Sequence, residues 1–375
     1  MNKEKCMQRH QALEGCTKIV VKAGTRLLTD PESVPQLITG IQALREQGMK
    51  VLLVSSGAVG NGMKQLKITK RPRKLADVQA LAAVGQAHLM ARYDEACRKF
   101  GFRSAQLLLT AEDLRSRERY LNIMNCIDSL WESNILPVIN ENDSVSVSAL
   151  KFGDNDILAA MIATMTRSRL TVILTTESGL RERNPDGTLG ARIPVVNKIN
   201  SELKGFAEGS DNSEFSIGGM ISKLRAAEMV NAAGEYCWVA DGRNPNALNE
   251  IIVGEDIGTL FVPRQKTMES RKRFIRFFAR CSGRLYVDNG AAKAITMNGK
   301  SLLPSGVTSV EGKFKRGATL EVVDPAGVVI ARGLSNFDSI DCQAIIGHKC
   351  LEITEILKRD ADDEIIHRDN LVVAF

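Results

Sequence analysis

The chain has 375 residues, of which 44% are hydrophobic and 25% are charged, and this composition is ordinary for a globular protein. Its length suggests about two domains of roughly 150 residues each. No apolar run approaches the ~18 residues of a membrane span, and the polar residues 1–16 lack the apolar region of a secretory signal. We therefore expect a cytoplasmic protein with no membrane anchor, whose residues 1–16 form a flexible tail.

Short β-rich runs alternate with amphipathic helical patterns from residue 17 to residue 263. The expected strands are Lys18–Lys22, Val51–Val54, Gln106–Leu109, Ile135–Ile139, Val172–Leu174 and Tyr236–Ala240. Helical patterns cover Leu75–Phe100, Arg117–Trp131 and Ile157–Met165. Several strands are apolar throughout, as in strands covered on both faces. The alternation predicts an α/β fold with an open, mainly parallel, doubly wound sheet.

The sequence changes character near its basic segment, Arg264–Arg284, which holds eight basic residues and one acidic residue. We expect residues 264–276 to be a basic linker, because charge runs are mostly solvated linkers or partner surfaces. Contact with RNA is the alternative interpretation of this segment. Residues 277–375 show short alternating runs separated by Gly, Pro, Asn and Asp, which predicts a small, mostly-β domain.

The cysteines and histidines indicate no metal site. The eight cysteines are scattered without a CxxC pair, which predicts reduced thiols. Only His348 and Cys350 approach the spacing of metal ligands, and two ligands do not make a zinc site.

Polar or glycine-containing segments follow five of the expected strands. These segments are Lys22–Thr25, Ser55–Ala58, Asn140–Asp143, Thr175–Thr176 and Asp241–Gly242. Ligands of such sheets bind outside the carboxyl ends of the strands. Polar loops in general explain any one of these segments but explain all five poorly, so we expect them to converge on one site.

Two lysine and glycine motifs have the character of anion sites. Lys22 ends a buried strand just before Gly24, and Lys223 lies in the first turn of a helix that follows Gly218 and Gly219. Glycines that lead into a helix N-terminus favour phosphate binding, although a simple turn is the alternative. A third run, Ala294–Ser301, ends like a phosphate-binding loop. It lacks the first glycine and the helix that should follow, so we reject it.

Acids and amides crowd the segment from residue 140 to residue 156. Asp154 suits the N-cap of the next helix and Asp156 suits its first turn. Capping explains one of these acids but not Asp143 or Asn155. The functional interpretation gives the acids two tasks, which are pairing with the ammonium group of a substrate and holding the phosphate-binding lysines.

Several motifs spread over residues 17–372 carry a family resemblance. They include VVKAGT, VSSGAV, LAAVGQ, PVINENDSV, KFGDND, GGMISKL and HRDNL. Through them the chain resembles the glutamate 5-kinases of the amino acid kinase family, in the form with a C-terminal PUA domain. PVINEND with GDND is specific to that branch, whereas the lysine and glycine motifs are shared by many relatives.

The resemblance implies an ATP-dependent phosphorylation of the side-chain carboxylate of L-glutamate, the first step of proline biosynthesis, with Mg²⁺ held mainly through the ATP phosphates. It implies that Lys22, Lys223 and Asp156 are catalytic. The residues implied to bind glutamate are Ser56, Gly57, Asn140, Asp143 and Asn155. Those implied to line the nucleotide site are Lys22, Gly24, Thr175, Thr176, Ile217, Gly218, Gly219, Met220, Ile221, Ser222 and Lys223.

The resemblance further implies partners: proline as feedback inhibitor, glutamyl phosphate reductase as the downstream enzyme, and further copies of the chain in a homo-oligomer. The chain departs from the family pattern at Arg26, Thr176, Arg181 and Ile217, the last three on the nucleotide side. Two alternatives remain open from the sequence. One is a kinase for another small acid, and the other is an RNA-binding regulatory protein with a decayed kinase domain.

Overall fold

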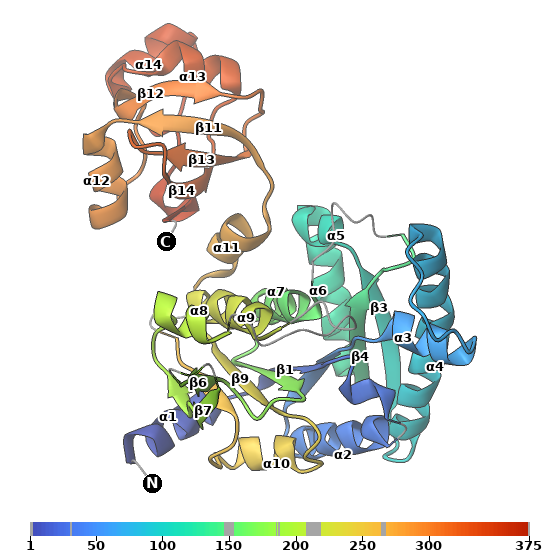
Figure 1. The fold of residues 1–375 in the computed structure, drawn as a ribbon. Helices are drawn as coiled ribbons and strands as arrows, with labels where there is room; N and C mark the ends of the chain where they lie inside the picture. Colours follow the sequence, from blue (N-terminus) through green and yellow to red (C-terminus); the bar gives the residue numbers. More distant parts are fainter. Residues whose placement is uncertain are drawn as a thin grey trace. The chain divides into compact units, whose positions relative to one another are not determined.

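The structure, a computed structural model, describes residues 3–30, 32–145, 154–184, 186, 188–207, 219–263 and 268–373. It divides into two compact units, which Figure 1 shows as ribbons. The first comprises Met1–Leu114 and Glu118–Thr267, and the second comprises Arg115–Arg117 and Met268–Phe375.

An eight-stranded sheet with the order β3-β4-β2-β1-β5-β9-β10-β8 forms the centre of the first unit. The strands are β1 (Lys18–Ala23), β2 (Lys50–Val54), β3 (Arg103–Leu109), β4 (Ile135–Glu141), β5 (Leu170–Thr175), β8 (Val195–Val196), β9 (Tyr236–Asp241) and β10 (Thr259–Phe261). The strands from β3 to β9 run parallel to their neighbours, and β10 pairs antiparallel with β9. The predicted fold class and all six predicted strands are confirmed.

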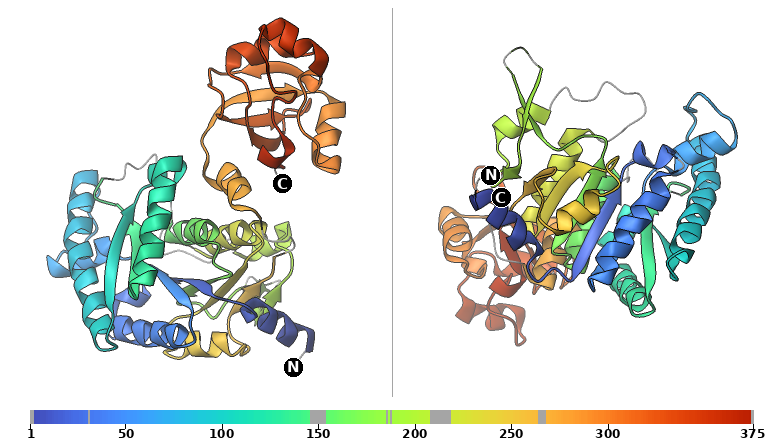
Figure 2. Two further views of the ribbon diagram at one scale, coloured as in Figure 1. Left: turned by 180° about the vertical axis from the view of Figure 1, so that it is seen from behind. Right: turned by 90° about the horizontal axis from the view of Figure 1, so that it is seen from below.

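Helices cover both faces of this sheet, as Figures 1 and 2 show for α2 and α10 on one face and α7 and α9 on the other. The helices of the unit are α1 (Lys3–Leu13), α2 (Ser33–Glu46), α3 (Ala58–Gln65), α4 (Leu75–Arg98), α5 (Ala111–Arg115), α6 (Arg117–Glu132), α7 (Asn155–Thr166), α8 (Ser201–Ala207), α9 (Met220–Ala232) and α10 (Ala247–Ile252). A small hairpin of β6 (Arg181–Arg183) and β7 (Leu189–Arg192) was not predicted.

The alternation of side chains along β1 decides where its lysine lies. Val21 and Ala23 belong to the apolar core that α2, α4 and α10 cover. Because successive side chains of a strand point to opposite faces, Lys22 lies on the face where α7 packs. The helix α7 is buried along most of its length, so its first turn is held against the carboxyl end of the sheet.

The structure differs from the flexible tail expected over residues 1–16. Residues Lys3–Leu13 form α1, in which Ala12 is buried and the buried guanidinium of Arg9 forms an ion pair with Asp256. The partner of Arg9 is 247 positions away along the chain, so no local pattern could show this contact.

The basic linker expected over residues 264–276 also differs in part. Residues 264–267 lie outside the described residues, but α11 (Ser270–Arg273) and a π-helical turn (Phe274–Phe278) follow. Arg273 is buried and its Nε donates to the carbonyl oxygen of Met268 at 2.6 Å. Phe274, Ile275 and Phe278 are buried as well, so this stretch is packed rather than solvated.

The second unit contains a five-stranded sheet with its own apolar core, as expected for a small, mostly-β domain. Its strands are β11 (Cys281–Val287), β12 (Val307–Glu311), β13 (Thr319–Val323), β14 (Val329–Leu334) and β15 (Leu371–Val373), and its further helices are α12 (Asn289–Asn298), α13 (Ser339–Ile345) and α14 (Cys350–Leu357). The rejected phosphate-loop run ends α12, with Gly299 as its C-cap, whereas a phosphate loop would begin a helix.

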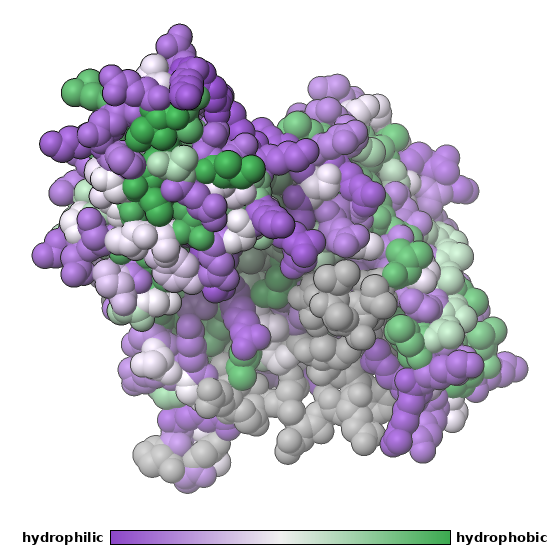
Figure 3. Space-filling model, turned by 90° about the horizontal axis from the view of Figure 1, so that it is seen from above, coloured by the Kyte–Doolittle hydropathy of each residue, from purple (hydrophilic) through white to green (hydrophobic). Residues whose placement is uncertain are grey.

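The surface in Figure 3 is mainly hydrophilic, with apolar side chains scattered among polar ones. Within the described residues, no helix is both long enough and apolar enough to cross a membrane. The same part of the chain contains no group of three or more His, Cys, Asp and Glu side chains that could hold a metal ion.

Two helices of the first unit meet backbone to backbone near the strand ends. A Cβ atom on Gly85 of α4 would lie 1.8 Å from the carbonyl oxygen of Ala58, and one on Gly62 of α3 would lie 2.0 Å from that of Leu81. Both distances are far below contact, so neither position accepts a side chain without moving a helix.

We therefore expect Gly85→Ala to lower the free energy of unfolding by about 1–3 kcal/mol, the usual cost of overpacking. Gly60→Ala on α3 is the matched control, because a Cβ there meets only Thr25 at 3.9 Å. Its expected effect is a small gain in helix stability. Urea unfolding of both variants tests the packing, and equal stabilities would contradict it.

Candidate active site

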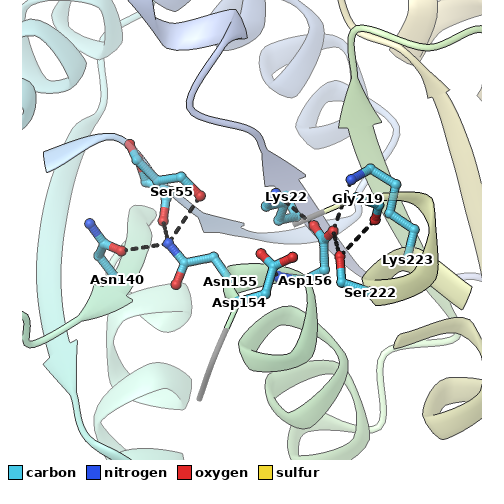
Figure 4. A network of polar contacts seen from close by, with 10 residues as sticks. Lys22, Ser55, Asn140, Asp154, Asn155, Asp156, Gly219, Ser222 and Lys223 are labelled. Atoms are coloured by element: carbon cyan, nitrogen blue, oxygen red, sulfur yellow. Dashed lines mark hydrogen bonds and ion pairs between the residues drawn. The ribbon is translucent and has the colours of Figure 1, made fainter. Parts of the chain in front are cut away.

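The candidate site lies at the carboxyl ends of β1, β2 and β4, where the first turns of α7 and α9 meet them (Figure 4). Lys22 is the last but one residue of β1, and Asn155 and Asp156 open α7. Lys223 lies in the first turn of α9, which begins after Gly219. Helix N-termini carry partial positive charge, so two of them at one place favour an anion.

Asp156 is the centre of a buried cluster of charges. Its side chain is 0% exposed, and its Oδ1 lies 2.6 Å from the Nζ of Lys22. Its Oδ2 lies 3.1 Å from the Nζ of Lys223 and accepts a hydrogen bond of 3.0 Å from the Oγ of Ser222. Both lysine side chains are almost fully buried. Two ammonium groups face one carboxylate, so the cluster carries a net charge of +1.

The pKa of Asp156 reflects the same contacts. Burial alone raises it, but the charges of Lys22 and Lys223 and their hydrogen bonds outweigh burial and lower the pKa to about 2. The carboxylate is therefore ionised at neutral pH. Lys22 and Lys223 bring two positive charges beside the single negative charge of Asp156, and positive charge in a buried place favours the approach of an anion.

Asn155 is the centre of a second, uncharged network beside the first. Its Nδ2 lies 2.8 Å from the carbonyl oxygen of Ser55, 3.0 Å from the Oγ of Ser56 and 2.9 Å from the Oδ1 of Asn140. All three atoms accept and share the two hydrogens of this nitrogen, so the Oδ1 of Asn155 remains as an acceptor for another group. Ser56 accepts from Asn155, which leaves the hydrogen of its hydroxyl group for donation.

Backbone conformation supports this second network at two places. Gly57 begins α3 with a φ of +88°, which favours glycine, and so turns the chain just after Ser56. Asp154 caps α7, because its side chain accepts from the backbone nitrogen of Asp156 at 3.1 Å. The predicted N-cap is thereby confirmed, and the cap orders the turn that carries Asn155 and Asp156.

The structure brings many of the predicted site residues together. Those joined by direct contacts are Lys22, Ser56, Asn140, Asn155, Asp156, Gly219, Ser222 and Lys223. Asp143 lies two residues beyond β4 and is half-buried. Gly24 follows β1 and its nitrogen donates to Leu174 at 3.3 Å, which sets it beside the end of β5 at Thr175.

For the remaining predicted residues among those described, the structure gives a position but no direct contact with the two networks. Thr176 follows β5 and is half-buried, Met220 is buried, and Ile221 is 38% exposed. Ile217 and Gly218 lie outside the described residues. Arg181, one of the departures from the family pattern, belongs to the β6–β7 hairpin, where its Nε donates to Gly190 at 2.9 Å.

Two residues of the site, Tyr93 and Gln86, were not predicted, and Ser55 was predicted only as part of a strand-end segment. Ser55 provides a carbonyl oxygen to Asn155, and its hydroxyl group lies 2.9 Å from that of Tyr93. Gln86 accepts from the Nδ2 of Asn140 at 2.9 Å. A signal for Gln86 existed, since it is a polar residue on the buried face of α4 beside Leu81, Ala82, Gly85 and Leu89.

Comparisons with known proteins show the family of the chain. Residues 17–241 match the amino acid kinase family, and residues 283–357 match the PUA domain. The chain is 41% identical over 372 residues to the glutamate 5-kinase of Trichlorobacter lovleyi, covering 97% of this chain and 99% of that one. It is 42% identical over 372 residues to that of Geobacter sulfurreducens, covering 97% and 100%. It is 43% identical over 363 residues to that of Caldanaerobacter subterraneus, covering 95% and 97%.

The chain therefore belongs to the amino acid kinase family and, within that family, to the glutamate 5-kinases.

The buried cluster makes a prediction about stability. Asp156→Asn removes the only negative charge of the described cluster and leaves Lys22 facing Lys223, so we expect a loss of about 3–5 kcal/mol in the free energy of unfolding. A pKa below that of an unfolded aspartate means that the carboxylate stabilises the fold above about pH 4 and that this contribution is lost as the pH falls towards 2.

The difference in stability between the wild type and Asp156→Asn should therefore narrow on acidification, as chemical unfolding at several pH values would show. Asp128→Asn is the matched control, because the side chain of Asp128 is 44% exposed and its ion pair with Lys18 is 4.0 Å long. A variant at Asp156 that is as stable as this control would contradict the prediction.

Proposed function

We propose that the chain transfers the γ-phosphoryl group of ATP to the side-chain carboxylate of L-glutamate and forms L-glutamyl 5-phosphate, the first step of proline biosynthesis. The observation that carries the proposal is the buried cluster with its net charge of +1, in which Lys22 and Lys223 share the carboxylate of Asp156. The roles of the individual residues rest on the same cluster and on the amide network beside it.

The reaction needs positive charge and alignment more than it needs a base. A carboxylate oxygen of glutamate attacks the γ-phosphorus, the bond from that phosphorus to the bridging oxygen breaks, and ADP leaves with the electron pair. No proton has to be removed from the nucleophile. Lys22 and Lys223 neutralise the oxygens of the moving group, and Asp156 holds both ammonium groups in place.

Asp156 itself is poorly suited to bind a metal, since each of its oxygens already faces an ammonium group. Mg²⁺ would instead be held mainly through the ATP phosphates, where it adds charge neutralisation to that of the lysines. The first turn of α9, with Gly219 and Ser222, and the end of β5, with Thr175 and Thr176, would line the nucleotide site. Ile217 and Gly218 complete the proposed set.

The amide network supports glutamate as the acceptor. A zwitterion needs acceptors for its ammonium group and donors for its carboxylate. The free Oδ1 of Asn155 and the carboxylate of Asp143 meet the first need, and the free hydroxyl hydrogen of Ser56 meets the second. Asn140 orders Asn155 through their 2.9 Å hydrogen bond, and Gly57 turns the chain beside Ser56.

Proline carries the same ammonium and carboxylate groups, and we propose that it inhibits by competing at this acceptor site. Assembly into a homo-oligomer and consumption of the product by glutamyl phosphate reductase complete the proposal. A kinase for another small acid is the alternative. A panel of acceptors tests it, and we expect glutamate to give the highest kcat/KM.

The activity is tested by following ADP formation with ATP and Mg²⁺, with and without glutamate, in the presence of hydroxylamine, which traps the acyl phosphate as a hydroxamate. ADP and hydroxamate should form together and only with glutamate. A protein that binds RNA in a salt-dependent manner, and neither consumes ATP nor is stabilised by it, would instead be the regulatory alternative.

Lys223→Ala should lower kcat by a factor on the order of 10²–10³, the scale for removing one donor that stabilises the charge of a transition state. Lys99→Ala, at the exposed C-terminal end of α4, is the control and should leave kcat unchanged. Turnover at the wild-type rate in the Lys223 variant would remove this residue from the mechanism.

A further inference from the structure

The helix α4 carries a buried glutamine that none of the proposed chemistry uses. Gln86 is 7% exposed, and its Oε1 accepts from the Nδ2 of Asn140 at 2.9 Å. Its own Nε2 is buried and makes no hydrogen bond in the part of the protein that the structure describes. An unpaired buried donor lowers stability, and an apolar side chain at this place would avoid that cost. The contact with Asn140 is the compensating feature.

Two backbone groups fix the direction of every amide in this network. The backbone nitrogen of Glu141 can only donate, so the Asn140 atom 2.8 Å from it must be the oxygen. The Nδ2 of Asn140 therefore faces Gln86 and can be satisfied only by an oxygen, which is the Oε1 of Gln86.

The same reasoning continues to Asn155. The carbonyl oxygen of Ser55 can only accept, so the amide atom of Asn155 that faces it must be the nitrogen. That nitrogen also donates to the oxygen of Asn140. The chain Gln86–Asn140–Asn155 therefore has one direction, and it leaves the oxygen of Asn155 for the acceptor substrate.

Gln86 reaches this network because α4 lies unusually close to α3. The contacts of Gly85 with Ala58 and of Gly62 with Leu81 permit the approach described above. Tyr93, two turns further along α4, contacts the hydroxyl group of Ser55 at 2.9 Å. The helix thus supports both β2 and β4 at the ends that hold Ser56 and Asn140.

We propose that Gln86 is a positioning residue for the acceptor substrate, acting through Asn140 on Asn155. The inference rests on the proposed function, because it assigns Gln86 to the glutamate side of that site. Gln86 does not contact Asp156 or the lysines, so its loss affects binding of the acceptor and spares the phosphoryl-donor side.

The test compares kinetic constants in Gln86→Met, which keeps the length of the side chain but removes the acceptor oxygen. We expect the KM for glutamate to rise about tenfold, which corresponds to a lost buried hydrogen bond with its partner left unpaired. The KM for ATP and kcat should change less than threefold. Gln42→Met, at a half-buried position of α2 outside the site, is the matched control and should change none of these constants.

Two further variants distinguish positioning through Asn140 from general damage to the fold. In an Asn140→Ala background the amide donor is gone, so Gln86→Met should cause no further rise in the KM for glutamate. Gln86→Glu keeps an acceptor oxygen and should retain a KM for glutamate within about threefold of the wild type. Melting temperatures measured with glutamate alone and with ATP alone report binding without turnover.

Three results would overturn the inference. They are an unchanged KM for glutamate in Gln86→Met, an equal rise in the KM values for glutamate and ATP, and additive effects in the Asn140→Ala background. A wild-type protein that forms no hydroxamate from glutamate would contradict the proposed function instead. The two failures are therefore distinguishable.

Discussion

The contact of one carboxylate with two ammonium groups is the interaction on which the site of this protein depends. Asp156 is fully buried and Lys22 and Lys223 nearly so, and the two lysines come from different elements, the strand β1 and the helix α9. Without the carboxylate, the two like charges would repel each other inside the protein. With it, they converge and retain one unit of positive charge. We propose that a phosphate oxygen of the nucleotide binds beside these two ammonium groups.

The arrangement of the sheet explains how residues so distant in the chain meet. Parallel strands place all their carboxyl ends at one edge, and β1, β2 and β4 are neighbours there. The N-termini of α7 and α9 return to the same edge. The topology of the sheet thus brings the lysines, the amides and the helix termini to one edge. Individual hydrogen bonds such as those of Asn155 then fix their final positions.

The sequence predicted the central strands well because strands covered on both faces leave apolar runs that few other structures share. The strands β6, β7, β8 and β10 have two to four residues each, too few for a periodic signal. The helix α1 was mistaken for a tail because its polar sequence shows no apolar face. Its anchor is the pairing of Arg9 with a distant aspartate.

The site was predictable where its residues stand at strand ends or helix starts, because those positions have a spacing that can be read along the chain. Lys22, Asp154 and Lys223 are of this kind. Gln86 is not, since its partner Asn140 is 54 positions away and on another element. Asp156 could be named, but its contact with both lysines follows from the packing of α7 against α9 and β1.

Asn155 and Asp156 are consecutive residues, yet the first belongs to the amide network and the second to the charged cluster. One peptide unit therefore separates the group that we propose to bind the acceptor from the group that we propose to hold the lysines. A shift of this helical turn moves Asn155 and Asp156 together. The distance between the groups proposed to bind the acceptor and the phosphoryl donor is therefore preserved when the site moves. A site for a longer or shorter acceptor would therefore require changes in the residues at the ends of β2 and β4.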